Sequence, residues 1–112
     1  MDMVETKSGN VLVLKVCGRL DSATAPAFEA KLAATVAAGQ AWIVVDCTEL
    51  NYLSSAGLRA FLGGAKQAKS RQGKLAVGGA VAQVREIFDL AGFAGILPIC
   101  ATVQEAVNVC VA

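Results

Sequence analysis

Residues 46–62 read DCTELNYLSSAGLRAFL and mark the passage from a buried strand into a helix. The apolar run directly before them, residues 42–45 (WIVV), is typical of a strand that is covered on both faces. We expect residues 46–48 to end this strand and residues 49–53 to form a loop. A helix is expected over residues 56–70, and a glycine three residues later ends it.

Strands and helices alternate on both sides of this stretch. Apolar periodicity and turn residues predict strands over residues 3–6, 11–16, 75–77 and 96–99, and further helices over residues 24–39, 81–91 and 102–109. The order β-β-α-β-α-β-α-β-α predicts an α/β fold, with a mainly parallel or mixed sheet of four to five strands and about four helices. We expect residues 1–112 to form one domain.

Helix ends carry recognisable residues. Ser22 or Thr24 is the candidate cap of the first helix, and Thr102 followed by Glu105 resembles a capping box for the last. In the helix over residues 56–70 we expect a buried stripe of Leu58, Leu62, Ala65 and Ala68. The pair Gly63-Gly64 in its middle indicates either close packing or a helix break.

Composition excludes several classes of function. Ten Lys and Arg against nine Asp and Glu leave a net charge of +1, which gives no electrostatic case for nucleic acid or an anionic membrane. The chain has no His, which removes His-based catalysis and His-ligated metals. Phosphate-loop, GxGxxG and GxSxG motifs are also absent. We therefore expect a non-enzymatic protein with no metal or other cofactor.

Cellular location is predicted from the charges and the cysteines. The first ten residues are charged and lack the apolar core of a signal peptide, and no apolar stretch is long enough to span a bilayer. Four cysteines, Cys17, Cys47, Cys100 and Cys110, form no CxxC pair and have apolar neighbours. We expect buried free thiols in a cytoplasmic protein.

Two serines stand at the junction between strand and helix. A helix start leaves backbone N–H groups unpaired and carries a partial positive charge. Ser54 is expected to cap the helix. Ser55 comes one place later and is followed by the small residues Ala56 and Gly57, so its hydroxyl is expected to be accessible. A phosphoryl group on Ser55 would meet free N–H groups and the helix dipole.

The same stretch resembles the phosphorylation motif of the STAS family, in particular of bacterial anti-sigma factor antagonists. The places of that motif are filled here by Asp46, Thr48, Ser55, Ala56, Gly57 and Leu58. Residues 18–21 (GRLD) resemble the step before the family's first helix, and residues 78–79 and 84–92 also fit, so the similarity covers nearly the whole chain.

The resemblance implies a partner switch that controls transcription. The unmodified protein would bind an anti-sigma factor that is a Ser/Thr kinase with a histidine-kinase-like ATPase fold, and so release the sigma factor. The kinase would inactivate the protein by phosphorylating Ser55, and a phosphoserine phosphatase would restore it. The resemblance further implies a set of residues that bind the partner: Asp21, Ser54, Ser55, Ala56, Gly57, Leu58 and Arg59.

One departure keeps alternatives open. Antagonists of this kind often carry Asp directly before the target serine, and this chain has Ser54 there, which makes Ser54 a competing phosphorylation site. A second interpretation is therefore a constitutive STAS subunit of a lipid-transport ATPase complex or a stress-signalling scaffold. A third is a small phosphate- or nucleotide-binding enzyme, which the strand-end serines suggest and the missing phosphate loop disfavours.

Half of the cationic residues fall within one window of the chain. They are Arg59, Lys66, Lys69, Arg71 and Lys74, and no Asp or Glu lies between Glu49 and Glu86. The window is interpreted as a solvated helix face, whose late cations complement the helix end, or as a basic rim that steers an acidic partner.

Overall fold

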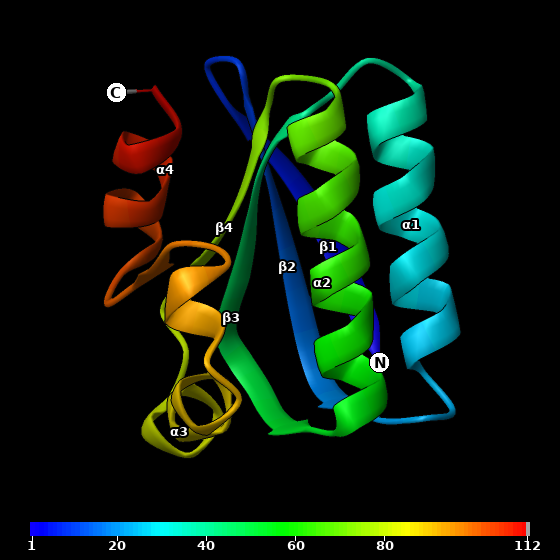
Figure 1. The fold of residues 1–112 in the computed structure, drawn as a ribbon, viewed down its shortest axis with the longest axis vertical. Helices are drawn as coiled ribbons and strands as arrows, with labels where there is room; N and C mark the ends of the chain where they lie inside the picture. The colour runs from blue at the N-terminus through cyan, green and yellow to red at the C-terminus, as the bar shows by residue number, and fades with distance from the viewer. Residues whose placement is uncertain (112) are drawn as a thin grey trace.

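The computed structural model describes residues 1–111 and contains one five-stranded sheet (Figure 1). Its strands are β1 (Asp2–Ser8), β2 (Val11–Leu20), β3 (Trp42–Leu53), β4 (Lys74–Gly78) and β5 (Ile99–Cys100). Its helices are α1 (Ala25–Ala37), α2 (Ser55–Ser70), α3 (Ala82–Leu90) and α4 (Val103–Val111), with a 3-10 turn at Phe93–Gly95. The predicted α/β class and the predicted order of elements are confirmed.

The strands follow one another across the sheet in chain order. β1 runs antiparallel to β2, to which it is joined by a tight turn at Gly9, and the pairs β2–β3, β3–β4 and β4–β5 are parallel. Helices α1, α2 and α3 provide the crossovers that parallel neighbours require. Because parallel strands end at the same edge, the turns after β2, β3 and β4 lie together there.

Helices cover both faces of the sheet. Alternate residues of the strands point to opposite faces, so Leu14 and Val45 pack on the side of α1, α2 and α3, while Val13 and Val44 pack on the side of α4. Figure 1 shows α1 and α2 side by side in front of the strands, with α4 apart from them. Between these layers Ile43, Val44 and Val45 of β3 are fully buried, as the apolar run predicts, whereas Trp42 at the start of the run is exposed.

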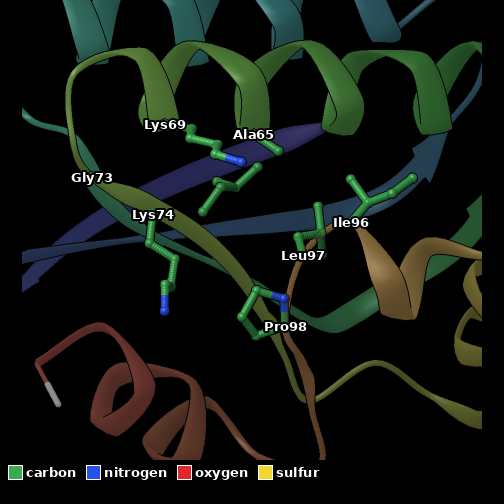
Figure 2. Close-up of a pocket in the computed structure, with 8 residues that line it drawn as sticks. Ala65, Lys69, Gly73, Lys74, Ile96, Leu97 and Pro98 are labelled. Carbon is green, nitrogen blue, oxygen red and sulfur yellow. The ribbon is translucent and has the colours of Figure 1, made fainter.

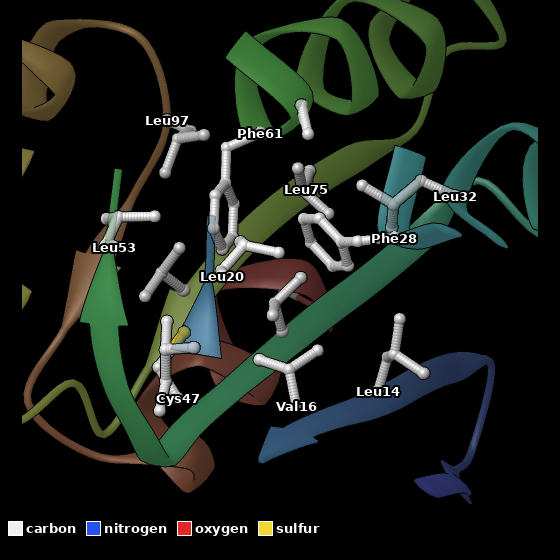
Figure 3. Packing of buried hydrophobic residues seen from close by; sticks show 14 of the residues in the cluster. Leu14, Val16, Leu20, Phe28, Leu32, Cys47, Leu53, Phe61, Leu75 and Leu97 are labelled. Carbon is white, nitrogen blue, oxygen red and sulfur yellow. The ribbon is translucent and has the colours of Figure 1, made fainter. Parts of the chain in front are cut away.

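Three phenylalanines hold the helices of one face together, and Figure 3 labels two of them, Phe28 and Phe61. The ring of Phe28 in α1 lies 4.9 Å from that of Phe61 in α2, and Phe61 lies 5.1 Å from Phe88 in α3. Such pairs contribute about 0.5–1.5 kcal/mol each beyond the burial of their area. The position of α2, and of the serines at its start, is therefore fixed from within the core.

The prediction of a loop at residues 49–53 is wrong, because β3 continues to Leu53. The pairing with β2 shifts twice, once after Asp46 and once after Leu50, and each shift inserts an extra residue into β3. These bulges interrupt the alternation that identifies a strand in sequence. β2 is likewise longer than predicted and passes through Gly18 to Leu20.

The expected buried stripe of α2 is confirmed at Ala68 and wrong at Leu58, Leu62 and Ala65. The residues that α2 buries are Gly57, Ala60, Phe61, Gly64 and Ala68, whereas Leu58, Leu62 and Ala65 are half-buried at the flank of the helix. The helix is continuous through Gly63-Gly64, so the close-packing interpretation holds at Gly64, where an added Cβ would lie 2.6 Å from Cδ1 of Leu32.

Near the C-terminus the last strand is shorter and later than expected. Residues 96–98 are not part of β5, which begins at Ile99, and Leu97 is buried in the core. Pro98 has no N–H for strand pairing, although its carbonyl oxygen accepts from the N–H of Val77 at 2.9 Å. One half of the expected capping box of α4 forms, with Thr102 Oγ1 accepting from the N–H of Glu105. The Glu105 carboxylate accepts from the N–H of Ala101 at 3.2 Å instead of from that of Thr102.

All four thiols are free, but only two of them are buried. Cys47 and Cys110 lie in the two apolar clusters, while Cys17 and Cys100 are half-buried, contrary to the expectation. Burial and the neighbouring Asp46 carboxylate raise the pKa of the Cys47 thiol far above its ordinary value. The expectation of buried free thiols is therefore confirmed for Cys47 and Cys110 only.

Candidate functional site

The candidate residues gather where β2 and β3 end. Leu20 and Leu53 are paired across these strands, and the backbone N–H of Ser54 donates to the carbonyl oxygen of Leu20 at 2.9 Å. The next residue after Leu20 is Asp21, and the next after Ser54 is Ser55. The register therefore places the turn before α1 and the start of α2 next to each other at one edge of the sheet.

Ser54 caps α2, as its position in the sequence predicts. Its backbone is extended, with φ −97° and ψ 174°, and its Oγ accepts a hydrogen bond from the backbone N–H of Gly57 at 3.3 Å. The side chain is partly buried. The hydroxyl of Ser54 is thus already engaged in holding the helix start.

Ser55 is the first residue of α2, and its side chain is exposed. Within residues 1–111 its hydroxyl has no hydrogen-bond partner. The first turn of the helix carries no acidic residue, so no carboxylate of that turn opposes a negative group there. Unpaired N–H groups and the helix dipole favour an anion at this position. The arrangement allows a phosphoryl group on the hydroxyl without disturbing the cap.

Gly57 allows α2 to approach the sheet closely. A Cβ at this position would lie 2.7 Å from Cδ1 of Leu53 and 2.9 Å from Cγ of Leu20. Gly57 is itself buried, so it contributes to the site by positioning its neighbours. Ala56 and Leu58 on either side of it are half-buried.

Asp21 organises the turn between β2 and α1. Its Oδ1 accepts from the backbone N–H of Ala23 at 3.0 Å and from that of Thr24 at 3.1 Å, and Nε of Arg19 lies 3.7 Å from its Oδ2. Desolvation, the largest single influence, raises the pKa of Asp21, but the hydrogen bonds from Thr24 and Ala23 and the charge of Arg19 together lower it. The carboxylate is therefore ionised and held in a fixed orientation at the edge that carries Ser55.

Thr24 precedes α1 but does not cap it with its side chain. Its Oγ1 instead donates to the carbonyl oxygen of Arg19 at 2.8 Å and accepts from the backbone N–H of Asp21 at 2.9 Å. The expected cap from Ser22 or Thr24 is thus replaced by a hydroxyl that braces the Asp21 turn.

Asp46 and Thr48, which fill the first places of the motif, interact with each other. Oδ1 of Asp46 accepts from Oγ1 of Thr48 at 2.7 Å and from its backbone N–H at 2.9 Å. Both residues lie at the first bulge of β3. Their visible role is to shape this bulge, and no hydrogen bond joins them to the serines within residues 1–111.

The sequence analysis missed a pair beside this edge, Arg19 and Tyr52. The guanidinium of Arg19 lies 3.9 Å from the centre of the Tyr52 ring, and both side chains are exposed. Their contact follows from the second bulge, which brings Tyr52 rather than Asn51 opposite Arg19. In the sequence, the only signal for this pair is an aromatic residue and a cationic residue near the ends of two predicted strands.

Arg59, the remaining candidate, lies on the exposed side of α2 and forms no ion pair within residues 1–111. The same residues contain no group of three or more Cys, Asp or Glu side chains able to hold a metal ion. None of the described helices is both long and apolar enough to cross a membrane.

The family is decided by comparison with known proteins. A family model described as "Mlab, STAS domain" matches residues 3–98. A Bordetella bronchiseptica protein named as an anti-sigma factor antagonist, BtrV, is 38% identical over 106 residues, which cover 95% of this chain and 91% of BtrV. The chain belongs to the STAS domain family of anti-sigma factor antagonists.

Solved structures share the fold of this STAS domain. An anti-sigma factor antagonist from Mycobacterium paratuberculosis superposes with a TM-score of 0.90 at 23% identity, covering 99% of this chain and 94% of that chain. The Bacillus cell fate determinant SpoIIAA in its phosphorylated form gives a TM-score of 0.73 at 19% identity, covering 96% and 97%. The predicted STAS-like architecture is therefore confirmed.

Proposed function

We propose that this STAS domain is a non-enzymatic switch that controls a sigma factor. In its unmodified form it binds an anti-sigma factor that is a Ser/Thr kinase with a histidine-kinase-like ATPase fold. The kinase inactivates it by phosphorylating Ser55, and a phosphoserine phosphatase resets it. In the phosphorylation step, Oγ of Ser55 bonds to the γ-phosphorus of ATP, ADP leaves, and the hydroxyl proton passes to a base on the kinase.

One observation carries this proposal: the hydroxyl of Ser55 is exposed and unpartnered at the first residue of α2, while Ser54 already caps the helix. Phosphorylation adds a charge of about −1.5 to −2. The free N–H groups of the helix start can accommodate this charge, so the fold is retained. A partner surface that packs closely on a hydroxyl does not accept an uncompensated dianion, so binding is lost.

The proposed contact surface combines the start of α2 with the turn at Asp21. Ser54 and Ala56 flank the phosphorylation site, and Gly57 allows the start of α2 to lie close to the strand ends. Leu58 and Arg59 present an apolar and a cationic group on the next turn. That the fold also occurs in a protein solved in a phosphorylated form supports a phosphorylation-dependent switch.

The test measures binding to the anti-sigma factor kinases of the source organism by titration calorimetry. We expect Ser55→Asp to abolish binding and Ser55→Ala to bind whether or not ATP is present. Ser54→Ala is the matched control, because it leaves Ser55 available. After this variant is incubated with the kinase and ATP, mass spectrometry should show one phosphoserine. The proposal is contradicted if both Ser55 variants bind the kinase as the wild type does. It is also contradicted if the kinase phosphorylates the wild-type protein on Ser54 alone.

A second candidate is a constitutive subunit of a lipid-transport ATPase complex. One observation favours it: Ser54 stands where antagonists often carry Asp. This candidate predicts stable co-purification with a transporter ATPase and no phosphoserine after incubation with any of the kinases. Release of the protein from its partner by ATP would exclude it.

A further inference from the structure

Arg19 and Tyr52 form a pair on the face of the sheet that α2 does not cover. They are partners across β2 and β3, directly before the buried pair of Leu20 and Leu53. Those two leucines pack beneath the start of α2, and consecutive residues of a strand point to opposite faces. Arg19 and Tyr52 therefore point away from α2. Both are exposed there, Arg19 with 60% of its side chain and Tyr52 with 40% of its surface.

The guanidinium of Arg19 is held between two neighbours. Its Cζ lies 3.9 Å from the centre of the Tyr52 ring, a cation–π contact that restrains the group. Its Nε lies 3.7 Å from Oδ2 of Asp21, close enough for attraction between the charges but too far for a hydrogen bond. Within residues 1–111 the guanidinium donates no hydrogen bond. Its two Nη groups, which form the edge opposite to Nε, are therefore free to bind another acceptor.

A carboxylate is the group that fits this edge of the guanidinium. Two parallel N–H donors match the two oxygens of a carboxylate, and such charged pairs are stronger than neutral hydrogen bonds. Because the ring of Tyr52 already restrains Arg19, less conformational entropy is lost when a carboxylate binds. The acids on the neighbouring strand ends are already engaged. Asp21 accepts from backbone N–H groups through Oδ1, and Glu49 forms an ion pair with Lys15.

The pair lies within reach of a partner that covers Ser55. Tyr52 precedes Ser55 by three residues, so their Cα atoms are at most roughly 11 Å apart even in a fully extended chain. Arg19 directly precedes Leu20, whose carbonyl oxygen accepts from the N–H of Ser54. A standard protein interface covers about 800 Å² per partner, a patch about 30 Å across. An interface centred on Ser55 therefore extends around the strand ends to Arg19.

We propose that Arg19, stacked on Tyr52, binds an Asp or Glu carboxylate of the anti-sigma factor kinase and thereby selects a partner that is acidic at this point. The proposal rests on the switch proposed above and adds to its contact surface a region on the opposite face of the sheet. Arg and Tyr are the residue types that most often dominate the binding energy of an interface. A kinase with a cation at this point would be repelled, which gives the contact a role in partner choice.

Titration calorimetry with a kinase that binds the unmodified wild type tests the proposal. We expect Arg19→Gln and Tyr52→Ala each to weaken binding by about tenfold or more, whereas Tyr52→Phe keeps the ring and should bind within about twofold of the wild type. The loss in Arg19→Gln should shrink as NaCl is raised, because salt screens the charge pair. Urea unfolding of the same variants should stay close to that of the wild type, since both side chains are exposed.

Lys69→Gln is the matched control, because it removes one positive charge at the other end of α2. Lys69 borders a hollow that is also lined by Ala65 and Leu97 (Figure 2). It lies fourteen residues after Ser55, or roughly 21 Å along the helix axis at 1.5 Å per residue. Its binding should remain within about twofold of the wild type. A loss equal to that of Arg19→Gln would show that only the net charge matters, and would overturn the proposal.

Charge reversal identifies the group on the partner. Arg19→Glu should abolish binding, and a set of kinase variants, each with one exposed Asp or Glu replaced by Lys, should contain one that restores it. The same kinase variant should bind the wild type more weakly than the unchanged kinase does. Restoration separates a direct contact from a disturbance of the Asp21 turn, which no change in the kinase can repair. If no kinase variant restores binding, the proposal is overturned.

The outcomes separate this contact from the switch itself. If the wild type binds none of the kinases, the proposed function fails and this contact fails with it. If the wild type binds, Ser55→Asp does not, and Arg19→Gln binds as the wild type does, then the switch stands and only the role of Arg19 is overturned. Because the unmodified protein is measured, a role of Arg19 limited to holding a phosphate on Ser55 would also give that second result.

Discussion

The backbone N–H of Ser54 donates to the carbonyl oxygen of Leu20 at 2.9 Å, which ties the start of α2 to the end of β2. The Asp21 turn follows one member of this pair, and the exposed hydroxyl of Ser55 follows the other. Both segments therefore share one backbone anchor inside the fold. Substitutions that disturb the anchor should change stability, whereas substitutions at Ser55 should change partner binding alone.

Ser54→Ala should lower the free energy of unfolding by about 1 kcal/mol, the usual cost of losing an N-cap hydroxyl. The reason is that the N–H of Gly57 loses its acceptor at the helix start. Urea unfolding followed by circular dichroism measures the change. Ser55→Ala is the control and should stay within about 0.5 kcal/mol of the wild type, since its hydroxyl is exposed and unpaired. Equal losses in the two variants would show that Ser54 is not the cap.

Ser54→Asp should retain the stability that Ser54→Ala loses. Asp is an equally good N-cap, and its charge is favourable beside the helix dipole. The variant also carries the residue that antagonists of this type often have before the target serine. The same unfolding measurement applies, and a loss as large as that of Ser54→Ala would contradict the expectation.

Asp21 should make stability depend on pH in the acid range. Its pKa is lowered in the folded chain, so the ionised carboxylate contributes stability at pH values above the ordinary Asp pKa. That contribution is lost as the pH falls through the lower, folded pKa. Asn at this position keeps an oxygen for the N–H groups of Ala23 and Thr24 but does not titrate. Thermal melts between pH 7 and about pH 3 should therefore show a flatter pH dependence for Asp21→Asn than for the wild type.

The four thiols should react unequally with an aromatic disulfide reagent. Cys17 and Cys100 are half-buried and should react in the native protein, Cys100 slowly because desolvation and the nearby Glu105 raise its pKa. Cys47 and Cys110 are buried and should react only after unfolding in guanidinium chloride. Peptide mapping of the modified native protein identifies the sites. Modification of Cys47 in the native state would show that the core opens around it.

The sequence could predict the site because helix caps and strand ends are local. Ser54 followed by small residues is sufficient to indicate a cap with a free hydroxyl after it, and parallel strand order brings the ends of β2 and β3 together. The contact between Arg19 and Tyr52 could not be predicted in this way. It depends on a bulge, which is an insertion of one residue into a register that only the folded sheet defines.

The buried face of α2 shows a second limit of sequence patterns. Apolar periodicity assigns burial to large side chains, and it therefore selected Leu58 and Leu62. The helix instead buries the face that carries Gly57 and Gly64, because the absence of a Cβ allows its backbone to approach the strand ends at Gly57 and Leu32 of α1 at Gly64. Glycine is read as a helix breaker in the sequence and acts here as a packing residue.

Two glycines of α2 should respond oppositely to alanine. At Gly57 the new Cβ would lie 2.7 Å from Leu53 and 2.9 Å from Leu20, both core side chains, so Gly57→Ala should destabilise the fold by about 1–3 kcal/mol. It should also weaken partner binding, because α2 must move outward with Ser55. At Gly63 no atom lies within 4 Å of the new Cβ, so Gly63→Ala should stabilise the helix by about 0.5–1 kcal/mol.

Urea unfolding of both variants, followed by binding of the anti-sigma factor kinase, separates packing from propensity. If Gly57→Ala were as stable as the wild type, Leu20 and Leu53 could relax around a methyl group, and the glycine of the motif would have to serve the partner rather than the fold. If Gly63→Ala were destabilising, the added methyl group would have to meet other atoms, and the space beside Gly63 would not be open. The difference in sign between the two variants is thus the direct measure of how closely α2 is seated on the sheet at its start.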